Sequence, residues 1–296
     1  MIALKTLTVI TTTYNRDYCL HQVYESLLRQ TSNDFVWLVL DDGSTDKTKD
    51  LVDKWISENK MAIVYHYKPN GGMHTARNAA YELAETELNV IIDSDDWMAD
   101  DAVETIVRFW QKHKREDIAG IISHNADPSG KQLGTPMPEG VSETTVTDFF
   151  GKLGGKGDKK LIYRSELTKK YPYPEFEGEK FFPASYKFRL LDQDYKMLVL
   201  DHVTCIVDYN DDSMTRDKFA QYRTSPKSFA YFRNEMMRIS KSAKECCNLA
   251  LHYVAESRFA KEKHFIKKAH RKGYVLLAYL PGTLLYFYLK KTKRKY

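Results

Sequence analysis

The chain has 296 residues, with 45 Lys and Arg against 40 Asp and Glu, and is 43% hydrophobic and 29% charged. This length gives room for one large or two small domains, at the usual ~100–200 residues per domain. The balanced composition excludes disordered, collagenous and multi-span membrane chains, and four cysteines without metal-site spacing indicate a reduced, cytosolic protein.

The first hundred residues alternate short apolar runs with helical patterns. Strands are predicted at 7–11, 35–40, 63–67 and 89–92, and helices at 20–28, 47–56 and 73–84. This order predicts a mostly parallel sheet covered by helices on both faces, in which ligands bind beyond the carboxyl ends of the strands. Polar clusters fall at those ends, at 12–15, 41–46, 68–72 and 93–96. We therefore expect a binding site there.

Two of these strand ends carry residues suited to a nucleotide. Asp42, after the second strand, can accept hydrogen bonds from a base or a ribose, whereas Ser44 or Asp46 fits the N-cap of the next helix. The loop 70–72 contains two glycines, which let backbone approach a ligand closely. Arg77 follows this loop and suits a phosphate.

Three carboxylates, Asp93, Asp95 and Asp96, follow the fourth strand within four residues. Such groups repel one another, and a bound divalent cation would remove that cost. Oxygen ligands without Cys or His favour Mg²⁺ or Mn²⁺. A structural role is also open, because Asp96 or Asp100 could cap the helix predicted to start near Asp101.

From about residue 144 the pattern is less regular. The glycine-rich run 151–157 predicts a flexible loop rather than a P-loop, because no Ser or Thr follows a Gly-Lys pair and no clear strand precedes it. Strands are predicted to return at 160–163 and 204–209, and the chain reads as helices beyond about residue 227.

Four ordered motifs together resemble the signature of the family 2 glycosyltransferases. They are 11–16, 40–46, 70–72 with 76–78, and 93–97. The resemblance is strong over about residues 5–110, weaker to about 215 and slight beyond. It implies the α/β GT-A fold, with a mostly parallel central sheet flanked by helices. A catalytic domain at 1–225, with a nucleotide-sugar-binding half at 1–110 and an acceptor half at 111–225, would precede a helical C-terminal extension at 226–296.

The resemblance implies roles for individual residues. Thr12 and Tyr14 would line the nucleotide pocket, with the Tyr14 ring against the base, and Asp42 would bind the base. Asn70 and Arg77 would support the base and the diphosphate.

The resemblance also implies an Asp-x-Asp site for Mn²⁺ or Mg²⁺ at Asp93 and Asp95, with Asp96 the other candidate ligand and Asp93 also facing the substrate. The general base of the family is a carboxylate in a Glu-Asp-like motif, which 176–183 matches best. Glu179 is therefore assigned as the base. Lys180 replaces the usual Asp and could depress the pKa of Glu179, which leaves three rivals for the role of base. These rivals are Glu177, Asp192 and Asp194.

An inverting enzyme follows from the resemblance. It would move a hexosyl or N-acetylhexosaminyl group from a nucleoside-diphosphate sugar, foremost a UDP-sugar, to an acceptor hydroxyl in one displacement. A sugar-phosphate nucleotidyltransferase is the alternative enzyme, but no Gly-rich, basic triphosphate loop follows the first strand. A non-enzymatic basic-tailed protein that binds nucleic acid lacks an aromatic-interleaved basic motif in its body. A Rossmann dehydrogenase lacks Gly-x-Gly-x-x-Gly after the first strand.

The end of the chain is basic and aromatic. Residues 261–296 contain eleven Lys or Arg and one acid, a charge of +10, so the first 260 residues sum to −5. The apolar stretch 274–289 is shorter than the ~20 residues that span a bilayer, and Pro281-Gly282 is expected to interrupt it. It fits an interfacial segment on an anionic leaflet, next to Lys290, Lys291, Lys293, Arg294 and Lys295. A helix docked on the catalytic domain is the other interpretation.

These features give an expected location. The first apolar run, Leu7–Ile10, is too short for a signal peptide, so we expect a protein that is not secreted. We expect it to be cytoplasmic and peripheral on the inner face of the cell membrane. There it would meet a lipid-linked or growing glycan acceptor of surface polysaccharide synthesis.

Overall fold

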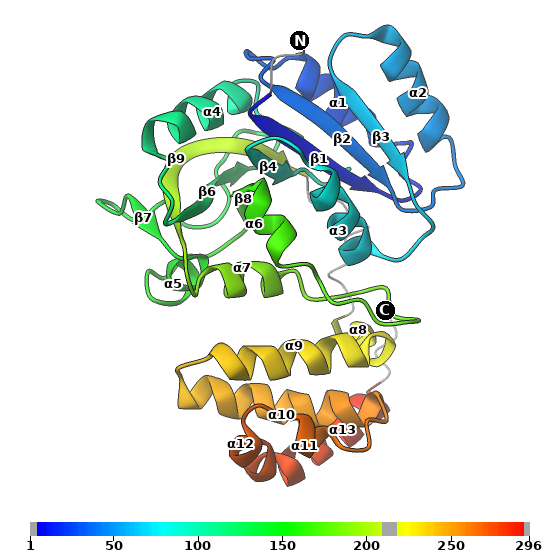
Figure 1. Ribbon diagram of the computed structural model, residues 1–296, viewed down its shortest axis with the longest axis vertical. Coiled ribbons are helices and arrows are strands. Elements are labelled where there is room, and N and C mark those ends of the chain that lie inside the picture. Colours follow the sequence, from blue (N-terminus) through cyan, green and yellow to red (C-terminus); the bar gives the residue numbers. More distant parts are fainter. Residues whose placement is uncertain (1–4, 209–217, 293–296) are drawn as a thin grey trace. The chain divides into compact units, whose positions relative to one another are not determined.

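The computed structural model describes residues 5–208 and 218–292, which group into two compact units (Figure 1). The first unit contains the described residues 5–71, 76–172 and 191–208, and the second contains 72–75, 173–190 and 218–292. Residues 173–190, which we expected in the catalytic domain at 1–225, therefore group with the helices that follow it. Lys293, Arg294 and Lys295 lie outside the described residues.

The chain up to residue 208 alternates strands and helices as the sequence predicts for its first hundred residues. The elements are β1 (Leu7–Thr13), α1 (His21–Leu28), β2 (Phe35–Asp41), α2 (Thr48–Glu58), β3 (Ile63–Tyr67), α3 (Met73–Leu83), β4 (Leu88–Ile91), β5 (Asp96–Met98), α4 (Ala102–His113), β6 (Ile118–Ala126), β7 (Glu143–Thr144), α5 (Val146–Gly151), β8 (Lys159–Arg164), α6 (Ser165–Lys170), α7 (Ser185–Leu191) and β9 (Lys196–Val207). The glycine-rich run 151–157 ends α5 and continues as an irregular loop, as expected.

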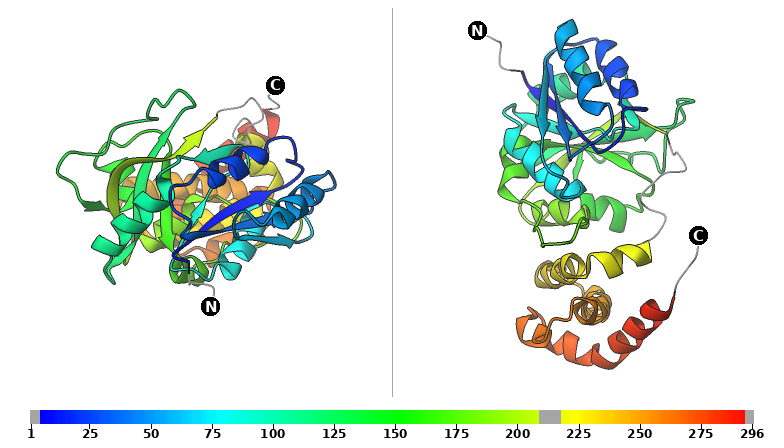
Figure 2. Two further views of the ribbon diagram at one scale, coloured as in Figure 1. Left: turned by 90° about the horizontal axis from the view of Figure 1, so that it is seen from above. Right: turned by 90° about the vertical axis from the view of Figure 1, so that its right-hand side faces the viewer.

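The nine strands form one sheet with the order β3-β2-β1-β4-β8-β6-β9-β5, and β7 pairs with β9. Strands β1 to β4 are parallel to one another, as predicted. The second half is mixed, because β8 runs antiparallel to both β4 and β6, while β6 and β9 are parallel. Helices flank this sheet (Figure 2). The first unit is thus an α/β fold whose parallel half carries all four predicted strand ends.

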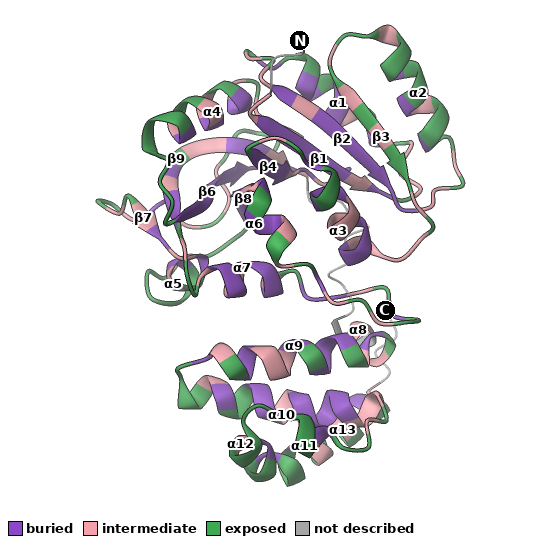
Figure 3. Cartoon of the chain, viewed as in Figure 1, coloured by how far each residue is buried: buried purple, intermediate pink, exposed green. Residues whose placement is uncertain are grey.

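Burial follows position in the sheet. Strands β1, β2 and β6 are buried along most of their length, whereas β3, at the edge, is mostly exposed (Figure 3). The amphipathic helix α4 turns Val103, Ile106 and Trp110 into the core, at the i, i+3, i+7 spacing of one helix face. Burying such side chains contributes roughly 1.5–3 kcal/mol each.

Every tryptophan of the chain belongs to the first unit. They are Trp37, Trp55, Trp97 and Trp110. The Trp55 ring stacks on Tyr24 with 4.4 Å between centroids, and Trp37 lies 5.7 Å from Trp55. This aromatic group packs α1 and α2 against β2, which holds the second strand and the loop after it in place.

The second unit is helical beyond residue 217, as the sequence predicts. Its helices are α8 (Lys218–Thr224), α9 (Pro226–Ile239), α10 (Ala243–Phe259), α11 (Phe265–Lys268), α12 (Lys272–Leu277) and α13 (Tyr279–Lys291). The expected interruption at Pro281-Gly282 is wrong. The break falls at Ala278, and Pro281 lies in the first turn of α13, where its missing N–H is not needed. Gly282 is buried where α13 meets α10, and a Cβ there would lie 2.7 Å from the Cβ of Val254.

Within the described residues, no helix has the length and apolar character needed to cross a membrane. All four cysteines are free; Cys19, Cys205 and Cys246 are buried, and Cys247 is exposed.

Candidate active site

The carboxyl ends of β1 and β2 are joined by hydrogen bonds between the loops that follow them. Asn15, at φ 52°, accepts a hydrogen bond at Oδ1 from the Thr45 N–H at 2.7 Å, and its own N–H donates to the Ser44 hydroxyl at 2.9 Å. The expected N-cap at Ser44 or Asp46 is wrong, because the N-cap residue of α2 is Lys47; Asp46, one residue earlier, accepts from the Thr48 N–H at 3.0 Å. These contacts leave Asp42 for another purpose.

Asp42 is a buried carboxylate surrounded by hydrogen-bond donors. It is 4% exposed, and its Oδ1 accepts from the Lys68 ammonium at 2.7 Å and from the Gly71 N–H at 3.0 Å. The Asn70 side-chain amide donates to Asp42 Oδ2 at 3.2 Å and to the Asp42 carbonyl at 2.8 Å. The second and third strand ends therefore meet at this carboxylate. Gly43 permits the approach: its φ is +89°, and a Cβ there would lie 2.6 Å from the Asn70 nitrogen.

Thr12 and Tyr14 lie at the end of β1. Thr12 is half-buried and pairs in register with Leu40 of β2. Tyr14 is 49% exposed, just beyond the last residue of the strand. The N–H of Asp42 donates to the carbonyl of Thr13, the residue before Tyr14, at 2.8 Å. An exposed ring at such a strand end has the properties needed to stack on a planar base.

The first two acids after β4 face arginines. Asp93 Oδ1 lies 3.1 Å from Arg77 Nη2, and Asp95 Oδ2 lies 3.9 Å from Arg16 Nη1. Partial desolvation by itself would raise the pKa of Asp93, but attraction to Arg77 and Lys160 outweighs it and holds this pKa below its ordinary value. The Asp93 side chain is 51% exposed and that of Asp95 29% exposed, so both reach solvent.

Asp96 has a different environment. It begins β5, is 6% exposed, and its Oδ2 lies 3.9 Å from the Lys160 ammonium. Burial raises the pKa of Asp96 to about 7, against the opposing attraction of Lys160. The acids around Lys160, together with Cys205, raise the pKa of Lys160 although the side chain is buried, so it stays an internal cation. The N-cap residue of α4 is Asp101, whose side chain forms no capping hydrogen bond, and Asp100 pairs with Arg29 at 3.0 Å. The capping role expected for Asp96 or Asp100 is therefore wrong.

A cation site can be tested against these positions. The described residues contain no group of three His, Cys, Asp or Glu side chains that could hold a metal ion by themselves. Asp93 and Asp95 are solvent-reaching oxygen donors two residues apart. They fit a hard cation that keeps several waters and takes its remaining ligands from a substrate diphosphate. Asp96 remains the third candidate ligand.

Glu179 lies in the second unit, at the start of α9. It is 8% exposed, its Oε1 accepts from the Lys227 N–H at 2.8 Å, and its Oε2 accepts from the Ser228 N–H at 2.8 Å and the Ser228 hydroxyl at 2.7 Å. These bonds satisfy backbone donors of the first turn and place a negative charge at the positive end of the helix. The residue expected to be the base thus also caps a helix.

The three other candidates for the base differ in exposure and in hydrogen bonding. Glu177 is exposed. Asp192 caps α5 by accepting from the Val146 N–H at 3.1 Å and the Thr147 N–H at 2.7 Å. Asp194 Oδ2 lies 3.5 Å from the Tyr171 hydroxyl.

The sequence-predicted residues of the first unit thus gather at one end of the parallel strands, and three cations complete the group. Lys68 and Arg16 stand inside the motifs that the sequence singled out, so their role could have been inferred from position. Lys160 opens β8 as the second of two adjacent lysines, a pattern that normally indicates an exposed strand end. Only the fold reveals it beneath the acidic cluster.

Comparison with known proteins agrees with this arrangement. The family model described as "Glycosyl transferase family 2" matches residues 8–171. Over 136 residues the chain is 32% identical to a chondroitin synthase of Pasteurella multocida (strain Pm70), which covers 45% of this chain and 14% of the relative. It is 31% identical over 116 residues to the minor teichoic acid biosynthesis protein GgaB of Bacillus subtilis (strain 168), covering 38% of this chain and 13% of the relative. The chain therefore matches only a small part of these longer proteins.

Solved structures share the fold. S. aureus TarS 1–349 in complex with UDP-GlcNAc gives a TM-score of 0.62 at 18% identity, covering 97% of this chain and 90% of that chain. The mannosyltransferase PcManGT from Pyrobaculum calidifontis, in complex with GDP-Man and Mn²⁺, gives 0.56 at 16% identity, covering 98% and 85%. At these identities the likeness concerns the fold alone.

Proposed function

The chain belongs to glycosyl transferase family 2 and is related to enzymes of polysaccharide biosynthesis, and we propose that it is an inverting glycosyltransferase that uses a UDP-sugar. It would transfer a hexosyl or N-acetylhexosaminyl group to a hydroxyl of a lipid-linked or growing glycan. The observation that carries this proposal is the joining of strand ends around Asp42, with the exposed Tyr14 at the end of the neighbouring strand β1.

Uracil suits this pocket. The base would lie against Tyr14 and donate its ring N–H to the carboxylate of Asp42, while Asn70 supports it from the next loop. Lys68, Asn70 and Gly71 already hold that carboxylate in place, so little ordering is required when the nucleotide binds. The UDP-GlcNAc complex of TarS supports the choice of UDP, and the GDP-Man complex of PcManGT keeps GDP as the alternative.

The diphosphate would lie over Arg77 and the acidic cluster. Asp93 and Asp95 would hold Mn²⁺ or Mg²⁺, which supplies charge neutralisation for the departing nucleoside diphosphate. Arg77 and Arg16 flank these carboxylates, so they are placed to bind phosphate oxygens. The positive charge of Lys160 offsets the negative charge of the buried Asp96, which reduces the repulsion among the three acids that follow β4.

Transfer would then proceed in one displacement. Glu179 would accept the proton of the acceptor hydroxyl, the hydroxyl oxygen would form the new bond to the anomeric carbon, and the bond to the nucleoside diphosphate would break with its electron pair. Attack from the opposite face inverts the configuration of that carbon.

The decisive experiment is transfer and donor hydrolysis across UDP-, GDP- and dTDP-sugars, with Mn²⁺, Mg²⁺ or EDTA. We expect release of UDP from one UDP-sugar, lost in EDTA. Release of pyrophosphate from a nucleoside triphosphate would instead support the nucleotidyltransferase. If no donor reacts, calorimetry with UDP and Mn²⁺ decides, because a glycosyltransferase still binds its product and absence of binding contradicts the proposal.

We also propose that the second unit binds the anionic inner face of the cell membrane, with the enzyme on the cytoplasmic side. The outer faces of α12 and α13 expose Leu277 at 79%, Leu280 at 74% and Leu284 at 70%. Lys290 and Lys291 follow at the end of α13 and are exposed. Exposed leucines beside lysines are typical of a helix that lies in the membrane interface. A surface-bound enzyme would meet a lipid-linked acceptor.

A further inference from the structure

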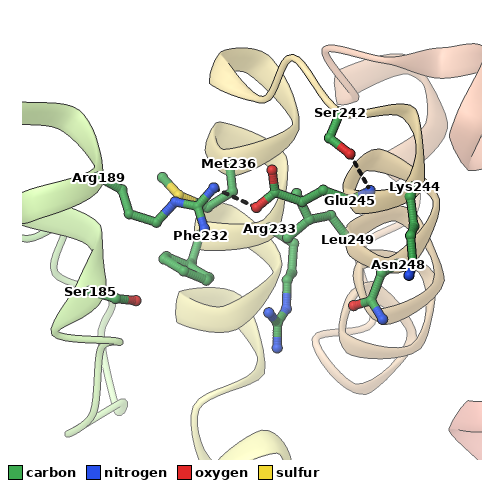
Figure 4. Close-up of a pocket in the computed structure, with 10 residues that line it drawn as sticks. All are labelled: Ser185, Arg189, Phe232, Arg233, Met236, Ser242, Lys244, Glu245, Asn248 and Leu249. Atoms are coloured by element: carbon green, nitrogen blue, oxygen red, sulfur yellow. Dashed lines mark hydrogen bonds and ion pairs between the residues drawn. The ribbon is translucent and has the colours of Figure 1, made fainter. Parts of the chain in front are cut away.

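A groove of about 580 Å³ lies within the second unit, between α7, α9 and the start of α10 (Figure 4). Phe232, Met236 and Leu249 give it apolar walls, and three cations, Arg189, Arg233 and Lys244, line it with one acid, Glu245. The cations outnumber the acid, so the groove has an excess of positive charge.

One of the three cations is already neutralised. Arg189 Nη2 lies 2.5 Å from Glu245 Oε1, and this pair joins α7 to α10. The Ser240 hydroxyl donates to the other oxygen of Glu245. Both the arginine and these hydrogen bonds lower the pKa of Glu245 against the effect of its burial, so its charge is retained. The excess positive charge therefore resides on Arg233 and Lys244.

Arg233 is held with its terminal nitrogens available. Its Nε lies 3.4 Å from Glu256 Oε1, while in the described part of the chain its Nη atoms donate no hydrogen bond. The side chain is only 16% exposed. Burial raises the pKa of Glu256 to about 7, so that near neutral pH this acid offsets only part of the arginine's charge.

Lys244 and Asn248 stand one turn apart on α10, and both line the groove with Arg233 (Figure 4). Lys244 is exposed and forms no ion pair within residues 5–208 and 218–292. A guanidinium fork, an ammonium and a side-chain amide together present donors on several sides of one space. Arginine binds phosphate through two parallel N–H bonds, and lysine adds charge without fixed geometry.

We propose that this groove binds the phosphate or diphosphate group of the acceptor, as a second anion site in addition to the nucleotide-sugar site proposed for the first unit. Arg233 and Lys244 bind the phosphate oxygens, Asn248 donates to one of them, and the apolar walls receive the adjoining part of the ligand. The assignment to the acceptor rests on the proposed glycosyl transfer, whereas the anion site itself does not.

The test is calorimetric titration of the full chain with inorganic pyrophosphate in metal-free buffer, for wild type and three lysine variants. Lys244→Glu should weaken the groove's pyrophosphate binding at least tenfold, and Lys244→Arg should largely retain it. Lys241→Glu is the matched control, because Lys241 is an exposed lysine just before α10 that does not line the groove. Equal binding by wild type and Lys244→Glu would overturn the proposal. Pyrophosphate held at the nucleotide site contributes equally to all four proteins and cancels.

Arg233→Lys is a second variant, chosen because it keeps a positive charge beside the buried Glu256. It should weaken pyrophosphate binding severalfold with an unchanged Tm. UDP affinity with Mn²⁺ should be the same in every variant, which shows an intact first unit.

Geranyl diphosphate and geraniol distinguish the sources of the phosphate. Tighter binding of geranyl diphosphate than of pyrophosphate indicates a lipid-linked acceptor, and equal binding indicates a phosphate-bearing glycan; both support the site. If geraniol, which carries no phosphate, binds as tightly as geranyl diphosphate, the proposed anion site is contradicted. If pyrophosphate binding depends on Lys244 but the protein neither transfers a donor sugar nor binds UDP with Mn²⁺, the anion site stands and the proposed function fails.

Discussion

Asp42 shows how a single buried carboxylate can join the loops that follow two neighbouring strands. Its carboxylate accepts hydrogen bonds from the ammonium of Lys68, the side-chain amide of Asn70 and the backbone N–H of Gly71. A buried acid with such partners is costly to alter, because removing its charge leaves donors unsatisfied.

We expect Asp42→Asn to weaken UDP binding at least tenfold, since the base loses its acceptor and Lys68 loses its counter-charge. The measurement is titration calorimetry with UDP and Mn²⁺. Asp53→Asn is the matched control: Asp53 forms an exposed ion pair with Lys49 on α2. Unchanged UDP affinity in Asp42→Asn would remove this residue from the nucleotide pocket.

Glu179 has two roles that one substitution can separate. We expect Glu179→Gln to lower kcat by ~10²–10⁴-fold with UDP binding retained, the usual contribution of a general base. The loss of one capping bond should also lower stability by roughly 1 kcal/mol.

Ser228→Ala is the comparison, because it weakens the cap while leaving the carboxylate in place. This variant should lose stability and keep kcat. Near-normal transfer by Glu179→Gln would move the base to Glu177, Asp192 or Asp194.

At the scale of single elements, α10 carries the half-buried His252 and the buried Glu256, which have opposite responses to pH. Burial and the charge of Arg233 lower the pKa of His252 from 6.5 to about 4. Burial raises the pKa of Glu256 from 4.5 to about 7, against the attraction of Arg233. Besides Arg233 of α9, the ring of Tyr222 on α8 faces His252, with 6.1 Å between ring centroids.

The two signs follow from which state holds the proton. The unfolded chain protonates His252 more readily, so this group costs stability as pH falls from 6.5 towards 4. The folded chain keeps Glu256 protonated, so this group costs stability as pH rises from 4.5 towards 7. Between pH 4.5 and 6.5 the two effects oppose each other.

We therefore expect each single variant to show the pH dependence of unfolding free energy that the other residue offsets in the wild type. Relative to wild type, His252→Gln should lose unfolding free energy as pH rises through this window, and Glu256→Gln should gain it, by at most about 1.4 kcal/mol per pH unit. Thermal unfolding across the window measures both. Two variants whose Tm changes with pH in parallel with wild type would contradict the opposed titrations.

Elements also show what could be predicted from sequence. Strands β1 to β4 each combine an apolar run with a polar end, and all four were predicted. Strand β6 was missed, because Gly120, Ser123, His124 and Asn125 make a wholly buried strand look like a loop. Helix α13 continues through Pro281 because the helix starts two residues earlier, a boundary that composition does not reveal.

The arrangement of the candidate residues, apart from their roles, was predicted to a similar degree. Tyr14, Asp42 and Asp93 follow the ends of β1, β2 and β4, so their position at one edge of the sheet followed from the parallel order. Arg77 reaches Asp93 from within α3. The contact between Lys160 and Asp96 joins residues 64 positions apart, through strands whose order no local pattern contains. The capping by Glu179 was hidden for the same reason.

For the whole molecule, charge and exposed apolar area are unequally shared between the units. We expect the protein to bind vesicles of phosphatidylcholine with phosphatidylglycerol and not vesicles of phosphatidylcholine alone. Leu277→Glu with Leu280→Glu should reduce this binding at least tenfold, because each exposed leucine would otherwise bury most of its surface in the interface. Flotation on a density gradient measures it.

Leu28→Glu with Leu153→Glu is the matched control, since both leucines are exposed in the first unit, at 39% and 41%. This pair should bind like wild type. Equal binding to neutral and anionic vesicles would contradict a role for the lysines, and no binding would contradict the membrane proposal.

The confinement of all four tryptophans to the first unit gives the chain a built-in optical label. Indole emission follows the unfolding of the sheet alone, whereas far-ultraviolet dichroism also records the helices of the second unit. Trp97, half-buried in β5 between Asp96 and Met98, adjoins the acidic cluster, so its emission should respond when nucleotide or cation binds. One unlabelled sample can thus report ligand binding and the separate melting of each unit.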